Sequence, residues 1–317
     1  MLGYVGRRAA SMLVVLFAAS IIVFLFLHLA PGDPATILLA GRPTTEEALT
    51  AVRAKYALDQ PLPVQYLTWI GNVLQGDLGE SIKGRDEVLN VLRPRLVTTL
   101  ALTAYAAVLM LLIGIPLGIV SAVRRGGAVD ATASFGALIV ASIPPYVSGV
   151  VLIAIFAVAL GWFPALGLGS GVADTFYHLT LPAIALALSA IAMVSRVTRV
   201  SMIGALATEY VETARIRGFS SRRIVLKHAL RSALIPVVTV SGVVVGYLLS
   251  GAILVEYTFG LNGIGSLLVS SVQGLDYAVV QAIALIITAE FLVISLVVDI
   301  LYAVIDPRVR FAGVGRP

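Results

Sequence analysis

Long runs of apolar residues alternate with shorter polar stretches along the whole chain. Six of these runs reach, or nearly reach, the roughly 20 apolar residues that a helix needs to cross a bilayer. They cover residues 9–30, 96–123, 131–160, 179–195, 233–255 and 278–298. The pattern predicts an all-α, polytopic membrane bundle of six transmembrane helices.

Two of the runs leave their helix geometry open. The third contains Pro144-Pro145, which is compatible with one kinked helix or with two short ones. We expect one kinked helix, because no polar turn interrupts the run. The fourth run is short, and we expect its helix to continue through Arg196 towards Arg199, since arginine can extend its charged end to the membrane surface.

The composition indicates that lipid surrounds much of the chain, and the placement of basic residues predicts which parts face the cytoplasm. The 317 residues are 59% hydrophobic and 12% charged, about half the charged share of a soluble domain. Fifteen of the 22 Lys and Arg residues lie near the two ends, directly after residue 123, or between residues 196 and 231, whereas 161–178 and 256–277 contain none. Because cytoplasmic loops are enriched in Lys and Arg, both termini are expected inside. The same rule explains the net charge of +5 without nucleic acid.

Candidate chemistry is sparse. The chain has no cysteine and three histidines, none at metal-ligand spacing. The glycine-rich stretch at residues 260–265 follows no predicted strand, so a nucleotide-binding loop is not supported there. We expect a protein that is not an enzyme and binds no metal or cofactor, so that a motor, if the protein needs one, must come from another chain.

The polar stretches divide the chain into expected parts. These are a transmembrane helix at 1–30, an extracytoplasmic segment at 31–95, a five-helix core at 96–306 and a cytoplasmic tail at 307–317. In the outer segment, Thr44 or Thr45 is expected to cap a helix at 46–56, and a second helix is expected at 62–74. Within the core, 205–231 reads either as two short helices joined at Gly218 or as a basic linker held by lipid headgroups.

Four residues in the last two runs are candidates for the pathway or for helix contacts. Glu290 and Asp299 are acids within an apolar run, where a carboxylate usually faces a partner or a water-filled path. We favour a structural contact for Glu290. Gly242 and Gly246 have the spacing of close helix packing, although they are equally compatible with a pore lining.

The segment Tyr210-Val-Glu-Thr-Ala-Arg-Ile-Arg-Gly218 resembles the EAA loop of ABC importer permeases. Glu212, Ala214 and Gly218 have the E-x-A-x3-G spacing of that family. Thr213 stands where many members have alanine, as is common in the peptide-transport branch. The proline that usually follows comes later here, at Pro236.

Four further segments are similar to signatures of the same branch. They are His28-Leu-Ala-Pro31-Gly32-Asp33-Pro34, Gly76-Asp-Leu-Gly-Glu-Ser81, residues 255–265 with Asn262 in place of proline, and residues 299–308 ending in Asp-Pro-Arg308. The five in this order resemble the first permease of the dipeptide/oligopeptide/nickel group.

That resemblance implies a type I ABC importer (MetI-like) fold in a bacterial inner membrane. It implies half of a heterodimeric pore for peptides, completed by a second permease, two ABC ATPase subunits and an extracytoplasmic substrate-binding protein, either periplasmic or a lipoprotein. The ATPase-coupling residues would be Glu212, Thr213, Ala214, Arg215, Arg217 and Gly218. Alternatives are the same architecture importing nickel or glutathione, a stand-alone secondary transporter, and an anchor subunit with no pathway.

Overall fold

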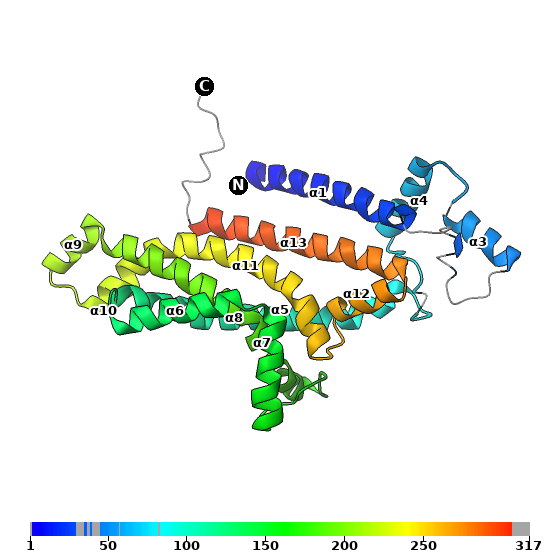
Figure 1. The fold of residues 1–317 in the computed structure, drawn as a ribbon. Helices are drawn as coiled ribbons and strands as arrows, with labels where there is room; N and C mark the ends of the chain where they lie inside the picture. Colours follow the sequence, from blue (N-terminus) through cyan, green and yellow to red (C-terminus); the bar gives the residue numbers. More distant parts are fainter. Residues whose placement is uncertain are drawn as a thin grey trace. The chain divides into compact units, whose positions relative to one another are not determined.

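The protein is described here by a computed structural model covering residues 2–29, 35–36, 39, 45–56, 58–81 and 83–305. Regular secondary structure in these residues is helical, apart from one antiparallel bridge between Glu80 and Glu87 (Figure 1). The predicted all-α class is therefore confirmed. The Pro31–Pro34 signature and the expected tail at 307–317 lie outside the described residues.

The described helices follow one another along the chain. In order they are α1 (Leu2–Leu29), α3 (Glu46–Tyr56), α4 (Leu62–Leu74), α5 (Val88–Val123), α6 (Ala128–Ser142), α7 (Pro145–Leu152), the π-helix η1 (Ile153–Ala159), α8 (Val172–Leu206), α9 (Glu209–Ile216), α10 (Ser221–Arg223), the π-helix η2 (Ile224–Ala229), α11 (Leu230–Thr258), α12 (Ile264–Gln273) and α13 (Tyr277–Ile305).

The chain forms two compact units. The core unit comprises Leu100–Leu261 and the residues from Val293 on, and the N-terminal unit comprises Leu2–Thr99 and Asn262–Leu292. Helices α5 and α13 each contribute to both units.

Helix α8 is the central helix of the core unit. It packs against α6, α7 and α11, and its apolar part is more buried than that of any other candidate span among the described residues. Many of its buried residues are alanines, which allow neighbouring helices to approach closely. The helix runs past Arg199 to Leu206, so the predicted extension of the fourth run is confirmed.

The third apolar run is broken. Helix α6 ends at Ser142 and α7 begins at Pro145, and the two helices are bent by 102° (Figure 1). Our expectation of one kinked helix is wrong, because the proline ring disfavours helical backbone in the residue before it. Ile143 is accordingly extended, with φ −94° and ψ 123°. Within the part of the chain that the structure describes, five continuous helices and this bent pair make up the candidate spans.

The N-terminal unit contains the two short helices that the sequence predicts between the first and second spans. The N–H of Ala48 donates to Thr45 Oγ1 at 3.2 Å, which caps α3. Near the start of α5, Val88 and Leu92 pack with Ile264 of α12 and with Val279 and Ile283 of α13. This cluster joins chain segments separated by more than 160 residues.

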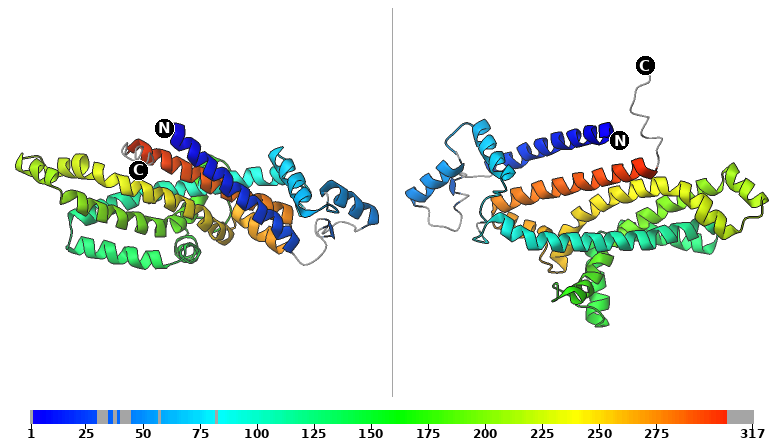
Figure 2. Two further views of the ribbon diagram at one scale, coloured as in Figure 1. Left: turned by 90° about the horizontal axis from the view of Figure 1, so that it is seen from above. Right: turned by 180° about the vertical axis from the view of Figure 1, so that it is seen from behind.

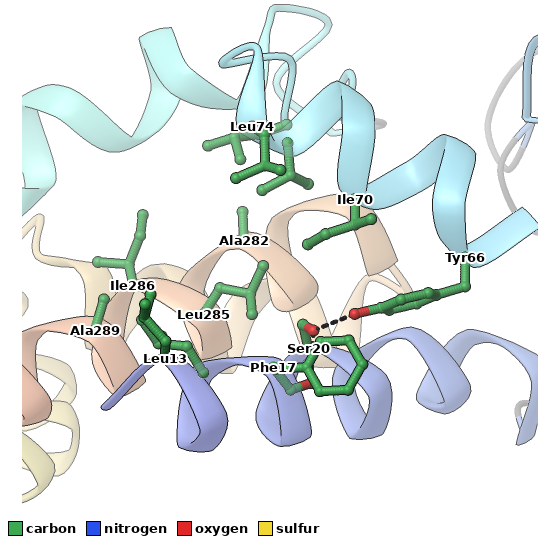
Figure 3. Close-up of a pocket in the computed structure, with 13 residues that line it drawn as sticks. Leu13, Phe17, Ser20, Tyr66, Ile70, Leu74, Ala282, Leu285, Ile286 and Ala289 are labelled. Carbon is green, nitrogen blue, oxygen red and sulfur yellow. Dashed lines mark hydrogen bonds between the residues drawn. The ribbon is translucent and has the colours of Figure 1, made fainter. Parts of the chain in front are cut away.

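Helices α1, α4 and α13 of the same unit line an apolar cavity of about 380 Å³ (Figure 3). At one end, the hydroxyl groups of Ser20 and Tyr66 lie 2.7 Å apart. The side-chain amide of Gln281 also donates to the Val23 carbonyl at 3.1 Å. These two hydrogen bonds fix α1 against α4 and against the first half of α13.

Candidate ATPase-coupling loop

The connection between α8 and α11 folds as two short helical segments, as one of the two sequence readings predicts. Helix α9 follows α8 after a turn at Ala207 and Thr208, and α10 with η2 leads back to α11. Val211 and Ala214 of α9 are buried against Ile224 of η2. The connection therefore has a small apolar core of its own, which a solvated linker would lack.

Helix α9 ends in a Schellman motif. The N–H of Gly218 donates to the Arg215 carbonyl at 2.9 Å, and the N–H of Phe219 donates to the Ala214 carbonyl at 3.2 Å. Gly218 has φ +77°, a backbone conformation that glycine adopts without steric cost. The motif also brings the residue after the glycine against the third residue from the helix end, and Phe219 packs on Ala214.

The Ala214-x3-Gly218 spacing thus has a structural reason. Alanine is small enough to lie 5% exposed beneath Phe219, and glycine supplies the left-handed backbone four residues later. These two of the six predicted coupling residues shape the loop.

Phe219 fixes the turn to the returning helix. Its ring stacks on His228 at a centroid distance of 5.7 Å, and the Arg223 guanidinium lies 4.7 Å from the ring centroid. The Tyr210 hydroxyl lies 3.1 Å from Ser232 Oγ of α11. The two halves of the loop are therefore held together by side chains from both.

The opposite side of α9 is exposed. It carries Glu212, Thr213, Arg215 and Arg217, so both charge signs are available to a partner. Within the described chain, no ion pair to the Glu212 carboxylate is found. Ile216 lies between the two arginines and is 82% exposed.

Ile216 was missing from the predicted site. The available signal was an isolated apolar residue in a charged stretch. Its position does not share the helical spacing of the apolar residues that form the buried face of α9. A single exposed apolar side chain is common on protein surfaces, and Ile216 becomes a contact candidate because it lies among the predicted coupling residues.

The other predicted residues lie on α11 and α13. A Cβ atom on Gly242 would overlap the side chain of Val298 of α13, within the core unit. This close approach supports helix packing over a pore lining for that glycine. Gly246 is buried, and Glu290 and Asp299 are half-buried, the first in the N-terminal unit and the second in the core unit.

Two signature segments have clear structural roles. Ser81, at the end of the Gly-Asp-Leu-Gly-Glu-Ser segment, is 2% exposed and donates its hydroxyl to Asp276 Oδ2 at 2.7 Å. The ring of Phe259, in the segment 255–265, is 1% exposed and would lie 2.9 Å from a Cβ atom on Gly149 of α7. Each segment therefore contributes one buried side chain, Ser81 or Phe259, that contacts a distant part of the chain within the same unit.

A model of the family described as binding-protein-dependent transport system inner membrane component matches residues 114–311. A second model, of the N-terminal region of such membrane components, matches residues 1–103. The chain belongs to this family.

Curated relatives agree. The glutathione transport system permease proteins GsiC of Escherichia coli strain CFT073 and of Salmonella choleraesuis strain SC-B67 are each 42% identical over 311 residues. That match covers 98% of this chain and 100% of each relative. Among solved structures, an inward-facing crystal form of the MetNI methionine ABC transporter has a TM-score of 0.58 at 20% identity, covering 69% of this chain and 97% of that chain. A second crystal form has a TM-score of 0.55.

The permease identity predicted from the sequence motifs is confirmed, as are the ABC importer function and the type I fold. The chain is a multi-pass protein of the inner membrane, and its family works with a substrate-binding protein and an ATPase. The stand-alone transporter and the anchor without a pathway are thereby set aside. In the part of the permease that the structure describes, no group of three or more His, Cys, Asp or Glu residues could hold a metal ion.

Proposed function

We propose that this permease forms half of a heterodimeric pathway for peptides and that residues 205–231 dock on one of two ATPase subunits. The observation that carries the docking assignment is α9 itself. Its inner face is buried, its end is fixed by the Schellman motif, and its outer face presents Glu212, Ile216 and two arginines.

The orientation follows from the charges. The loop and the end of α8 that leads into it, residues 196–231, carry eight of the 13 basic residues after position 100, which supports a cytoplasmic location for the loop and for both termini. The substrate-binding protein would then deliver solute on the opposite side, near residues 31–95. ATP and Mg²⁺ would be bound by the ATPase subunits alone, and membrane lipid would cover the exposed apolar spans.

The proposed cycle is a two-state exchange. Closure of the ATPase pair on ATP would move the docked α9 helices of both permeases and favour the state open to the binding protein. Hydrolysis would return the cytoplasm-facing state. This chain supplies the mechanical contact and half of the pathway.

A short peptide is the substrate class that we propose. The two relatives at 42% identity are named for glutathione, a tripeptide, which favours short peptides over nickel. The binding protein that works with this permease should therefore carry a short peptide when purified, and mass spectrometry of the released ligand tests this. A bound nickel complex instead would overturn the substrate assignment.

Charge reversal at Glu212 tests the docking. Glu209 is a matched control, because it is exposed and shares the first turn of α9, so reversal at either position costs the same interaction with the helix dipole. We expect Glu212→Lys to lose the ATPase subunits during purification and to abolish ATP-driven peptide uptake by proteoliposomes. Glu209→Lys should keep both. Normal ATPase retention and uptake with Glu212→Lys would refute the assignment.

A further inference from the structure

One carboxylate in the core unit accepts hydrogen bonds from three other parts of the chain. Asp130, near the start of α6, is 5% exposed. Its Oδ1 accepts a hydrogen bond from Arg199 Nε at 2.5 Å and its Oδ2 accepts one from Arg199 Nη2 at 2.8 Å. This two-point pairing fixes the orientation of the guanidinium as well as its distance. Helix α6 is therefore bound to α8 at a defined register.

Helix α5 and the turn after it contribute to the same node. Ser121 donates its hydroxyl to Asp130 Oδ1 at 2.5 Å, and the N–H of Gly126 donates to Oδ2 at 3.0 Å. Two neutral donors and one fork-shaped cation thus surround the carboxylate. Asp130 joins α5, α6 and α8, and no sequence pattern predicts this contact because the ion-pair partners lie 69 positions apart.

Two further close approaches join these three helices. At the far end of α6, Ser189 of α8 donates its hydroxyl to the Ile143 carbonyl at 3.3 Å. Between α5 and α8, a Cβ atom on Gly118 would lie only 2.5 Å from the Ser195 carbonyl oxygen. Helix α6 is therefore attached to α8 at both of its ends, and it lies alongside α8 when the molecule is seen from above (Figure 2).

Helix α8 continues from this joint to the coupling loop. Arg199 lies seven residues, about two helical turns, before Leu206, where α8 ends. Over those turns, Met202 and Ala205 are buried against Ala229 and Ala233 of the returning chain. At the C-terminal end of α6, the chain bends by 102° into α7.

We propose that Asp130 and Arg199 are positioning residues that carry movement of the coupling loop from α8 to α6 and so to the bend before α7. The inference rests on the proposed docking of α9 on an ATPase. With the joint intact, a tilt of α8 carries α6 along, and the change in angle is taken up at the extended residues between α6 and α7. Without the joint, α8 can tilt while the first turn of α6 stays behind.

The test compares three variants in the complete complex with its binding protein. They are Arg199→Gln, Asp130→Asn and the matched control Arg196→Gln, which removes an exposed arginine one turn earlier on α8. The readout is peptide imported per ATP hydrolysed, measured in proteoliposomes. Coupling between two sites is typically worth five- to 150-fold, so we expect the ratio to fall at least about fivefold in the first two variants and to stay unchanged in the third.

The double variant Asp130→Asn/Arg199→Gln should be no worse than either single variant, because all three break one joint. An unchanged ratio in Arg199→Gln, or an equal fall in Arg196→Gln, would overturn the inference. If the wild-type complex itself neither holds the ATPase subunits nor imports peptide, the proposed function fails instead. If Arg199→Gln retains the ATPase subunits, docking is intact, and its import-to-ATP ratio then tests the Asp130–Arg199 joint alone.

A second experiment, based on chemical cross-linking, applies if these variants assemble poorly. The chain has no cysteine, so Asp130→Cys/Arg199→Cys can be joined selectively by a bifunctional thiol reagent about as long as an arginine side chain. We expect the linked complex to recover the import-to-ATP ratio that the unlinked complex has lost. An equal ratio before and after linking would refute a positioning role.

Discussion

Replacing Gly218 by alanine should weaken ATPase binding through backbone conformation alone. Gly218 has φ +77°, and no atom lies within 4 Å of the place where a Cβ atom would be. The substitution therefore adds no clash with neighbours, and its cost is that of placing a side chain in left-handed backbone, about 1–2 kcal/mol. If docking requires the intact turn, this corresponds to a loss of up to about 5- to 30-fold in ATPase affinity.

Three further variants should rank in their loss of ATPase affinity. Gly218→Asn should cost less than Gly218→Ala, because asparagine tolerates this backbone region better, and Gly218→Val should cost more. Gly204→Ala is the control, since Gly204 is helical and its Cβ position is also open. Alanine in a helix is favoured over glycine by roughly 0.5–1 kcal/mol, so this control should bind ATPase normally.

The assay is the affinity of detergent-purified permease complexes for the ATPase subunits, combined with hydrogen exchange at the amide of Phe219. That amide donates to the Ala214 carbonyl only while the motif is intact. We expect faster exchange and weaker binding to appear together in Gly218→Ala. Wild-type exchange with weak binding, or faster exchange with wild-type affinity, would refute the link between the turn and docking.

Two further predictions concern α11 and α13. Gly242→Ala should lower the free energy of unfolding of the purified permease by about 1–3 kcal/mol through overpacking. Val298→Ala in the same chain should recover much of the loss, because it removes the opposing methyl groups. An unchanged melting temperature in Gly242→Ala would contradict the packing role. Glu290→Gln should assemble and transport normally if Glu290 serves a structural contact, whereas loss of uptake with normal assembly would assign it to the pathway.

The elements that the sequence predicts well depend on local signals. The bounds of α3 and α4 agree with the predicted ranges. For α3 the local signals were the capping residue Thr45 and the acids in the first turn. The turn at Gly218 was predicted for the same reason, since a Schellman motif is specified within six residues.

The elements that the sequence did not predict depend on distant contacts or on an ambiguous apolar run. Asp130 and Arg199 are isolated charges until the fold brings α6 against α8. Pro144-Pro145 was visible, but an apolar run does not show whether the chain bends slightly or turns through 102°. The informative residue was Ile143, whose helical conformation the following proline disfavours.

The break between α6 and α7 also bears on how such a bend is tolerated at membrane depth. Each backbone N–H without an acceptor in hydrocarbon costs several kcal/mol, and a helix start usually leaves several of them. Here the N-cap residue of α7, Pro144, and its first helical residue, Pro145, are prolines, which have no N–H to satisfy. The Pro144 carbonyl accepts from Val147 and Ser148, and the Ile143 N–H donates to the Val140 carbonyl. The prolines and these hydrogen bonds together leave few unpaired backbone donors at the bend.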